Sequence, residues 1–195
     1  MKFALFVLIA FCSLQGFGMH RMDTTWNQTD EMGMKQGYWK KSYPNGELMY
    51  KGFFRNNKPA GKMLRYYEDG SLQAELVFHE NTNVTYATMY FNNGQAGAIG
   101  KYISQKRDSI WSFYSYYTGT LSYQENYSMG KKHGVSIVYY AEGAVAEKTW
   151  WQDGMKQGKW EQFFEDSTLR LSSAYQPKKP AIKYETVQTN QLDLF

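Results

Sequence analysis

The chain has 195 residues, a net charge of +4 and an aromatic content of 18%, so it is long enough for one folded domain and only mildly basic. Its Lys and Arg residues are scattered rather than clustered, which excludes a nucleic-acid-binding footprint. The single cysteine, Cys12, leaves no pair for a disulfide and no set of thiolates for a metal site.

Residues 1–18 have the pattern of a secretory signal peptide. A basic residue opens the segment, an apolar run fills residues 3–14, and small residues follow up to Gly18. We therefore expect an exported protein, periplasmic or secreted, that is cleaved near Gly18 and has no transmembrane span in its mature form. Lipid attachment at Cys12 is the alternative, but bulky Phe11 stands where lipoproteins need a small residue.

Residues 19–33 form a lead segment, and we expect this segment, with Trp26, to cap one end of the fold. From residue 34 to residue 176 one pattern returns six times, and each copy has an aromatic six positions and a turn residue nine positions after its leading residue. The offsets between copies are 24, 24, 25, 24 and 24, which places the extra residue between the third and fourth copies. The leading residues are Gly37, Gly61, Thr85, Ile110, Gly134 and Gly158.

Each copy contains a tight-turn dipeptide between two runs rich in Tyr, Phe, Trp, Val and Ile, which are residues typical of strands. Asn45-Gly46 in the first copy favours a two-residue type I′ turn, because both residues tolerate positive φ. Such a turn places Tyr43 opposite Leu48. The sequence therefore predicts an all-β fold, an elongated single antiparallel sheet of six tandem β-hairpin repeats of about 24 residues each.

The same register sorts the side chains onto two faces, because successive residues of a strand point to opposite sides. With Trp39 opposite Gly52, one face collects Trp39, Phe54 and their equivalents in the other copies. We expect this apolar face to be the buried one. The opposite face is mixed, with charged residues beside pairs such as Tyr38 opposite Phe53.

The repeating unit resembles the MORN repeat, most closely the bacterial variant often described as an antitoxin-type module. In the first copy the match rests on Gly37, Trp39, Tyr43, Gly46, Leu48 and Phe54. The third copy departs with Thr85 and Ala87, and the fourth has Ile110 and Trp111, with the tryptophan one position early. The resemblance implies an elongated hairpin array used for contacts with proteins or lipids, but fold and rhythm alone do not assign an antitoxin role.

The mixed face holds the candidate interaction surface. Equal positions in successive hairpins stack side by side, so its apolar residues are expected to form a stripe over the middle copies, with charged residues at both ends. An apolar centre with a polar surround is typical of a protein interface. The candidate residues are Leu64, Tyr66, Tyr90, Phe113, Ile137, Tyr139 and Trp150.

No pattern in the sequence indicates a catalytic, cofactor or metal site. The three histidines, His20, His79 and His133, have neither the spacing of metal ligands nor the setting of a hydrolytic triad. Acidic pairs such as Glu68-Asp69 fall in hairpin turns, where carboxylates satisfy backbone donors. We therefore expect a non-enzymatic protein without a cofactor, and the oligomeric state stays open.

Two functions are compatible with these features. The first is an exported module that binds a protein partner or the envelope surface through the mixed face. The second is a carbohydrate or cell-wall binding module, whose exposed aromatic rings would lie flat and about one sugar apart.

The repeat rhythm ends near residue 176. The tail 177–195 opens with Pro177-Lys178-Lys179-Pro180 and is expected either to run back as an edge strand or to remain mobile.

Overall fold

The computed structural model describes residues 25–175. The predictions for residues 1–24, including the signal peptide, and for the tail 177–195 lie outside the described residues. Among the described residues every regular element is a strand, and no helix is long and apolar enough to cross a membrane. The strands are β1 (Gln28–Thr29), β2 (Lys35–Ser42), β3 (Leu48–Arg55), β4 (Lys58–Tyr66), β5 (Leu72–Phe78), β6 (Val84–Tyr90), β7 (Ala96–Ile103), β8 (Lys106–Tyr114), β9 (Leu121–Ser128), β10 (Lys131–Lys132), β11 (Gly134–Tyr139), β12 (Val145–Gln152), β13 (Met155–Phe163) and β14 (Leu169–Tyr175).

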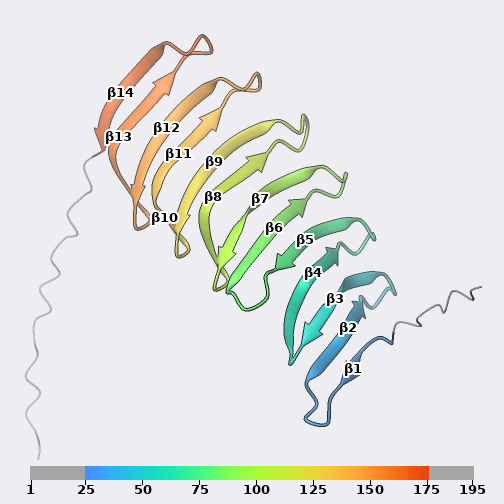
Figure 1. Ribbon diagram of the computed structural model, residues 1–195. Coiled ribbons are helices and arrows are strands. Elements are labelled where there is room, and N and C mark those ends of the chain that lie inside the picture. Colours follow the sequence, from blue (N-terminus) through green and yellow to red (C-terminus); the bar gives the residue numbers. More distant parts are fainter. Residues whose placement is uncertain (1–24, 176–195) are drawn as a thin grey trace, which may run out of the picture.

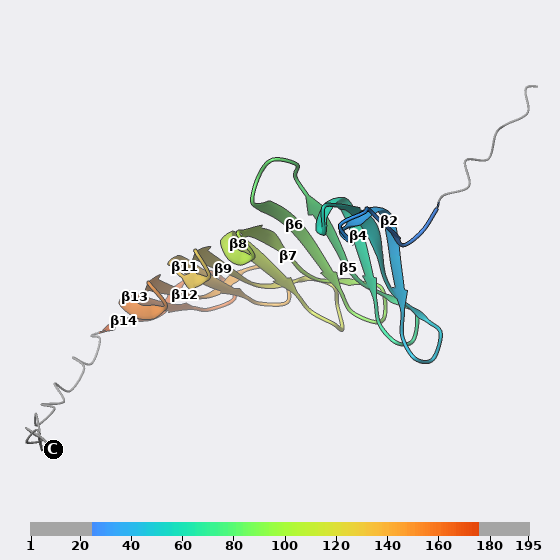
Figure 2. The same ribbon diagram turned by 90° about the horizontal axis from the view of Figure 1, so that it is seen from below.

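The strands form one open antiparallel sheet whose order follows the chain (Figure 1). Only the short β10 lies off the main path, where it pairs with β9. Six hairpins follow one another along the twisted sheet: β2–β3, β4–β5, β6–β7, β8–β9, β11–β12 and β13–β14. Figure 2 shows that the sheet is a single curved layer. The predicted elongated sheet of tandem hairpins is confirmed.

The hairpins close through longer turns than the sequence suggested. In β2–β3 the Gly46 amide donates to the Tyr43 carbonyl at 3.0 Å, and the Tyr43 amide donates to the Glu47 carbonyl at 2.8 Å. Within the loop between β2 and β3, only Gly46 has a positive φ, at 92°. Pro44 has the fixed negative φ that a type I turn requires. The prediction of a type I′ turn is therefore wrong, since the chain uses a type I turn followed by a glycine bulge.

The change of turn alters the strand register only next to the loop. Ser42, rather than Tyr43, lies opposite Leu48, whereas Trp39 lies opposite Gly52 as predicted. Tyr43 lies at the start of the loop, just beyond the last residue of β2, and its side chain reaches the next hairpin.

Tyrosine hydroxyls in this position connect successive hairpins. Each hydroxyl donates to a main-chain carbonyl of the next hairpin, at 2.8 to 2.9 Å. The bonds run from Tyr43 to Tyr66, from Tyr67 to Tyr90 and from Tyr140 to Phe163. In the third copy Phe91 takes the position and packs edge-on against Tyr116, with ring centroids 5.2 Å apart.

A bulge marks the start of most copies. The register between β3 and β4 shifts beside Gly61, whose φ is 64°. Gly37, Gly134 and Gly158 also have positive φ. Thr85 does not, and β5 and β6 pair there without a shift. The leading glycine of the repeat is therefore a bulge residue, and the third copy lacks the bulge.

The fourth copy begins at Ser109 rather than Ile110. Ser109 has a φ of 59°, and the register between β7 and β8 shifts beside it. The hairpin loop of this copy is longer, because the Gly119 amide donates to the Ser115 carbonyl four residues back. The extra residue lies in this loop, so the prediction that placed it between the third and fourth copies is wrong. Trp111 then takes the regular tryptophan position.

The register divides the sheet into two faces, which we call face A and face B. Face A contains Trp39, Phe54 and their equivalents, and face B contains Tyr38, Phe53 and their equivalents. The buried side chains of residues 25–175 all lie on face A, which confirms the predicted buried face. They are Phe54, Ala74, Ala87, Ala98, Trp111 and Thr149.

Trp111 is the centre of a buried hydrophobic cluster. Its side chain is fully buried against Ala87 and Ala98, and its indole N–H donates to the Lys101 carbonyl at 3.0 Å. Gly100 provides the space, because a Cβ on this residue would lie 2.2 Å from the indole ring. The single layer thus builds its core by pairing a large side chain with a glycine on the neighbouring strand.

The described part of the lead segment lies against β2. β1 pairs with β2, and the Trp26 ring packs on Tyr38 with centroids 5.8 Å apart. The Asp30 carboxylate accepts the Met34 amide and the Gln36 side chain, both at 2.9 Å. One end of the sheet is therefore partly covered within residues 25–175.

Candidate functional site

The structure places the predicted interaction stripe on face B, with one exception. Phe113 lies on face A, opposite Ala98 and Tyr123, and its ring stacks on Tyr123 at a centroid distance of 4.4 Å. The prediction for Phe113 is wrong because a frame error of one residue moves a side chain to the other face. Ser112 holds the position expected for Phe113, and Tyr114 aligns with Tyr66 and Tyr139. The residues that do lie on face B are Leu64, Tyr66, Tyr90, Ile137, Tyr139 and Trp150.

Contacts within the sheet already engage the face B stripe. All six residues are half-buried. The Tyr139 hydroxyl donates to the Gln124 side chain at 2.8 Å, Lys51 Nζ lies 5.9 Å from the Tyr66 ring centroid, and Trp150 lies opposite Val135. Such cross-strand contacts stabilise a sheet without any external partner.

Face A shows a recurring cation–π arrangement. In the first copy Lys35 Nζ lies 4.6 Å from the Trp39 ring centroid and 5.1 Å from that of Phe54. In the fourth copy Arg107 Cζ lies 4.8 Å from the Trp111 ring centroid and 5.5 Å from that of Tyr127. Both cations stand two positions before the leading residue, and both tryptophans stand two positions after it. The cation and the tryptophan together close face A in these copies.

A polar network holds the arginine of the fourth copy in place. Arg107 donates to the Tyr127 hydroxyl at 3.1 Å, and that hydroxyl donates to the Glu125 carboxylate at 2.6 Å. Burial and the hydrogen bond to Glu125 raise the pKa of Tyr127 above its ordinary value. The tyrosine therefore stays protonated and keeps both bonds at neutral pH.

The second and third copies lack both parts of this arrangement. Pro59 and Asn83 replace the cation, and Met63 and Ala87 replace the tryptophan. Neither replacement fills the volume of an indole capped by a lysine or arginine stem. Face A is therefore open over β4 to β7.

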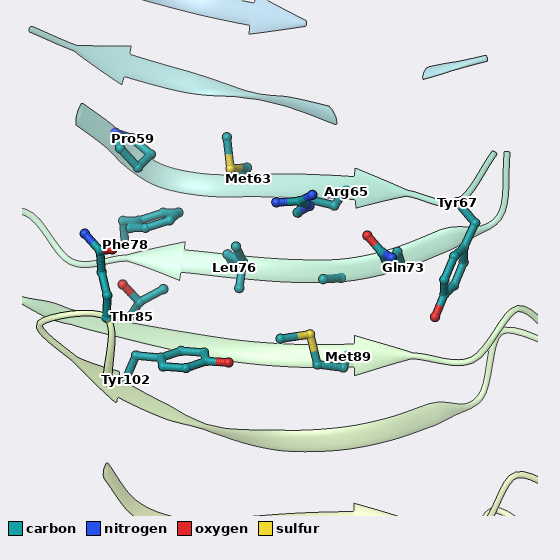
Figure 3. Close-up of a pocket in the computed structure, with 12 residues that line it drawn as sticks. Pro59, Met63, Arg65, Tyr67, Gln73, Leu76, Phe78, Thr85, Met89 and Tyr102 are labelled. Atoms are coloured by element: carbon teal, nitrogen blue, oxygen red, sulfur yellow. The ribbon is translucent and has the colours of Figure 1, made fainter. Parts of the chain in front are cut away.

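The opening is a groove of about 790 Å³ on face A (Figure 3). Figure 3 shows side chains from neighbouring strands converging on it, with Met63, Leu76 and Met89 across its middle and Arg65 beside them. The lining residues are Pro59, Met63, Arg65, Tyr67, Gln73, Ala74, Leu76, Phe78, Thr85, Met89, Tyr102 and Gln105.

The groove combines apolar walls with a single charged group. None of its lining residues is acidic, and within residues 25–175 Arg65 forms no salt bridge. Methionines at its centre can adapt to differently shaped apolar groups. The groove therefore suits a ligand with apolar groups and one carboxylate, because the Arg65 guanidinium has donors to offer.

The sequence did contain the signal for this groove. The third copy lacks the leading Gly and the Trp, and Pro59 and Asn83 replace the cation in the second and third copies. A comparison of the positions two before and two after each leading residue finds the second and third copies as the only pair that lacks both groups.

The acidic residues in the turns serve the turns themselves. Hydrogen bonds from the Ser71 hydroxyl and amide hold the pKa of Asp69 below its ordinary value, and Thr168 does the same for Asp166. A general acid needs the opposite shift. Within the part of the chain that the structure describes, no three His, Cys, Asp or Glu side chains gather into a group that could hold a metal ion.

Comparison with known families finds one match. The family described as MORN repeat variant matches residues 35–56 and 60–81, which correspond to the hairpins β2–β3 and β4–β5. No curated protein matches the sequence. The matched residues include all of β5 and β4 from Ala60 onward, which form one wall of the groove.

Proposed function

This chain is a MORN-repeat protein, and we propose that it is a non-enzymatic binding module that holds an extended segment of a partner protein in the face A groove. MORN repeats in general bind proteins or membranes. The observation that carries the proposal is the joint loss of the tryptophan and the cation in two neighbouring copies, which opens the apolar groove around Arg65.

The groove also suggests the chemistry of the partner segment. The groove crosses β4 to β7, a span of roughly 14 Å at about 4.8 Å per strand, and about four extended residues cover this distance. Apolar side chains of the segment pack against Met63, Leu76 and Met89, and an Asp or Glu side chain pairs with Arg65. A basic segment is disfavoured, because Arg65 repels it and the lining has no carboxylate.

The arrangement of the exposed aromatics favours a protein partner over a sugar. Tyr38 meets Phe53 at an interplanar angle of 82°, and Tyr86 meets His79 at 69°. These edge-on contacts do not form the flat row of rings that stacking on a polysaccharide requires.

Export belongs to the same proposal, since the pattern of residues 1–18 supports a function outside the cytoplasm. N-terminal sequencing of the protein purified from its own host is expected to begin near Met19. Recovery of an intact Met1 in the mature protein contradicts export with cleavage.

Closing the groove tests the proposed site. The variant Pro59→Lys/Met63→Trp rebuilds in the second copy the closed arrangement of the first. The matched control is Leu64→Trp, which adds the same ring to the same strand but on face B, within the predicted stripe. The probe is a phage-displayed library of random 12-residue peptides selected on the wild-type protein.

We expect selected peptides to combine apolar residues with Asp or Glu, and the groove-closing variant to weaken their binding at least tenfold by calorimetry. Leu64→Trp is expected to leave the affinity within twofold. If Leu64→Trp abolishes binding and the groove-closing variant does not, the site is the face B stripe instead.

A further inference from the structure

The last strand of the described sheet has an open outer edge. β14 lies at the end of the array in Figure 1, and within residues 25–175 it pairs only with β13. Tyr175 is 48% exposed, whereas Phe54, which holds the same position in the first copy, is 7% exposed. Leu169 and Leu171, on the same face, are also exposed.

A hollow on face A accompanies this edge. It measures about 360 Å³ and is lined by residues that include Trp160, Ser173 and Tyr175. Over a small residue of an earlier copy, the equivalent space is filled by the residue two positions after the next leading residue. Trp111 fills it over Gly100.

The sizes of two facing side chains on neighbouring strands are complementary at this position, which we call the size rule. Where the residue two positions after the leading residue is large, its partner on the neighbouring strand is small. Met63 lies opposite Gly52, and Trp160 lies opposite Thr149. The small Ala87 instead lies opposite the larger Leu76. Ser173 is a small residue in the partner position, so the rule predicts a large side chain over it.

The six full copies end near residue 176, but the sequence after β14 still matches the start of a further copy in phase with the repeat. Lys179-Pro180-Ala181 begins four positions after Tyr175, just as Lys58-Pro59-Ala60 begins four positions after Phe54, and a lysine follows two positions later in both. The next leading position is Ile182, and the position that fills the hollow is Tyr184. A large aromatic thus occurs where the size rule requires one.

A leading residue other than glycine is compatible with strand pairing that has no bulge. Ile182 disfavours the positive φ of a bulge because it is β-branched. The third copy, with Thr85, shows the alternative, in which Phe78 pairs with Thr85 without a bulge. The same register pairs Tyr175 with Ile182 and Ser173 with Tyr184.

We propose that residues 179–187 are the first strand of a seventh, half repeat, which pairs with the outer edge of β14 and seats Tyr184 in the hollow over Ser173. Ile182, Tyr184 and Thr186 then extend face A, and Lys183 and Glu185 extend face B. Repeat arrays need such caps because an unpaired edge strand recruits other chains.

Disulfide trapping in the full chain tests the register. With Cys12→Ala as background, Ser173→Cys/Tyr184→Cys is expected to form an intramolecular disulfide on mild oxidation, seen as a monomer without free thiols. The matched control is Ser172→Cys/Tyr184→Cys, because Ser172 lies on face B. Equal trapping of both pairs, or no trapping of either, overturns the register. A disulfide-linked dimer would show that a second copy covers the edge instead.

Hydrogen exchange supplies a measurement that needs no cysteine. Tyr184→Pro is expected to accelerate amide exchange in residues 169–175 at least tenfold, because proline removes a donor and disturbs strand pairing. Gln191→Pro, placed beyond the proposed strand, is expected to leave that exchange within twofold. Unchanged exchange in Tyr184→Pro overturns the proposal.

Discussion

At the scale of single residues, the contact between Gly100 and Trp111 decides how this thin sheet forms a core. Trp111 is fully buried although no second layer among residues 25–175 covers the sheet, because Gly100 lets the indole lie directly on the neighbouring strand. A side chain at Gly100 and the indole at position 111 are therefore alternatives for one space.

Gly100→Ala is expected to lower the free energy of unfolding by about 1–3 kcal/mol, since an added methyl group overpacks the site. Trp111→Ala alone is expected to cost about 3–5 kcal/mol. In the Trp111→Ala background the alanine at position 100 has room, so its additional cost should fall below about 0.5 kcal/mol. Urea denaturation of the four proteins measures this coupling, and an equal cost of Gly100→Ala in both backgrounds contradicts the packing described.

At the scale of elements, the hairpins were predictable because their signals are local. Turn residues and alternating aromatics define strands, faces and most of the register within a single copy. The type I turn was missed because Asn45-Gly46 is compatible with two turns, and Pro44 decides between them. The frame of the fourth copy was missed because a serine occupies the bulge position that glycine holds elsewhere, and this error displaced Phe113 to the wrong face.

Two deletions locate the extra residue of the fourth copy. Deleting Tyr117, which is 90% exposed in the loop, restores the regular spacing and is expected to change the free energy of unfolding by less than about 0.5 kcal/mol. Deleting Ile110 should turn Trp111 away from face A and cost about 3–5 kcal/mol, as loss of a buried tryptophan does. Chemical denaturation distinguishes them, and equal tolerance of both deletions contradicts the assigned frame.

At the scale of the whole molecule, the copies share the hairpin shape but differ in whether side chains cover face A. The hairpins repeat throughout, but face A is closed by a tryptophan and a cation in the first and fourth copies and is open between them. The apolar residues of the mixed face predict a binding surface on face B, whereas the groove has no such signal because it is created by groups that are missing. The positions of Met63 and Ala87 carry information only by comparison with the tryptophans of the other copies.

Methyl NMR of the methionines tests most directly whether the groove is the binding site. Met63 and Met89 line the groove, whereas Met49 lies on face B and Met155 is exposed at the start of β13. With ¹³C-methyl-labelled methionine and a saturating amount of a selected acidic, apolar peptide, the resonances of Met63 and Met89 are expected to shift strongly, and those of Met49 and Met155 to stay in place. Shifts confined to Met49 or Met155, with Met63 and Met89 unchanged, would contradict binding in the groove.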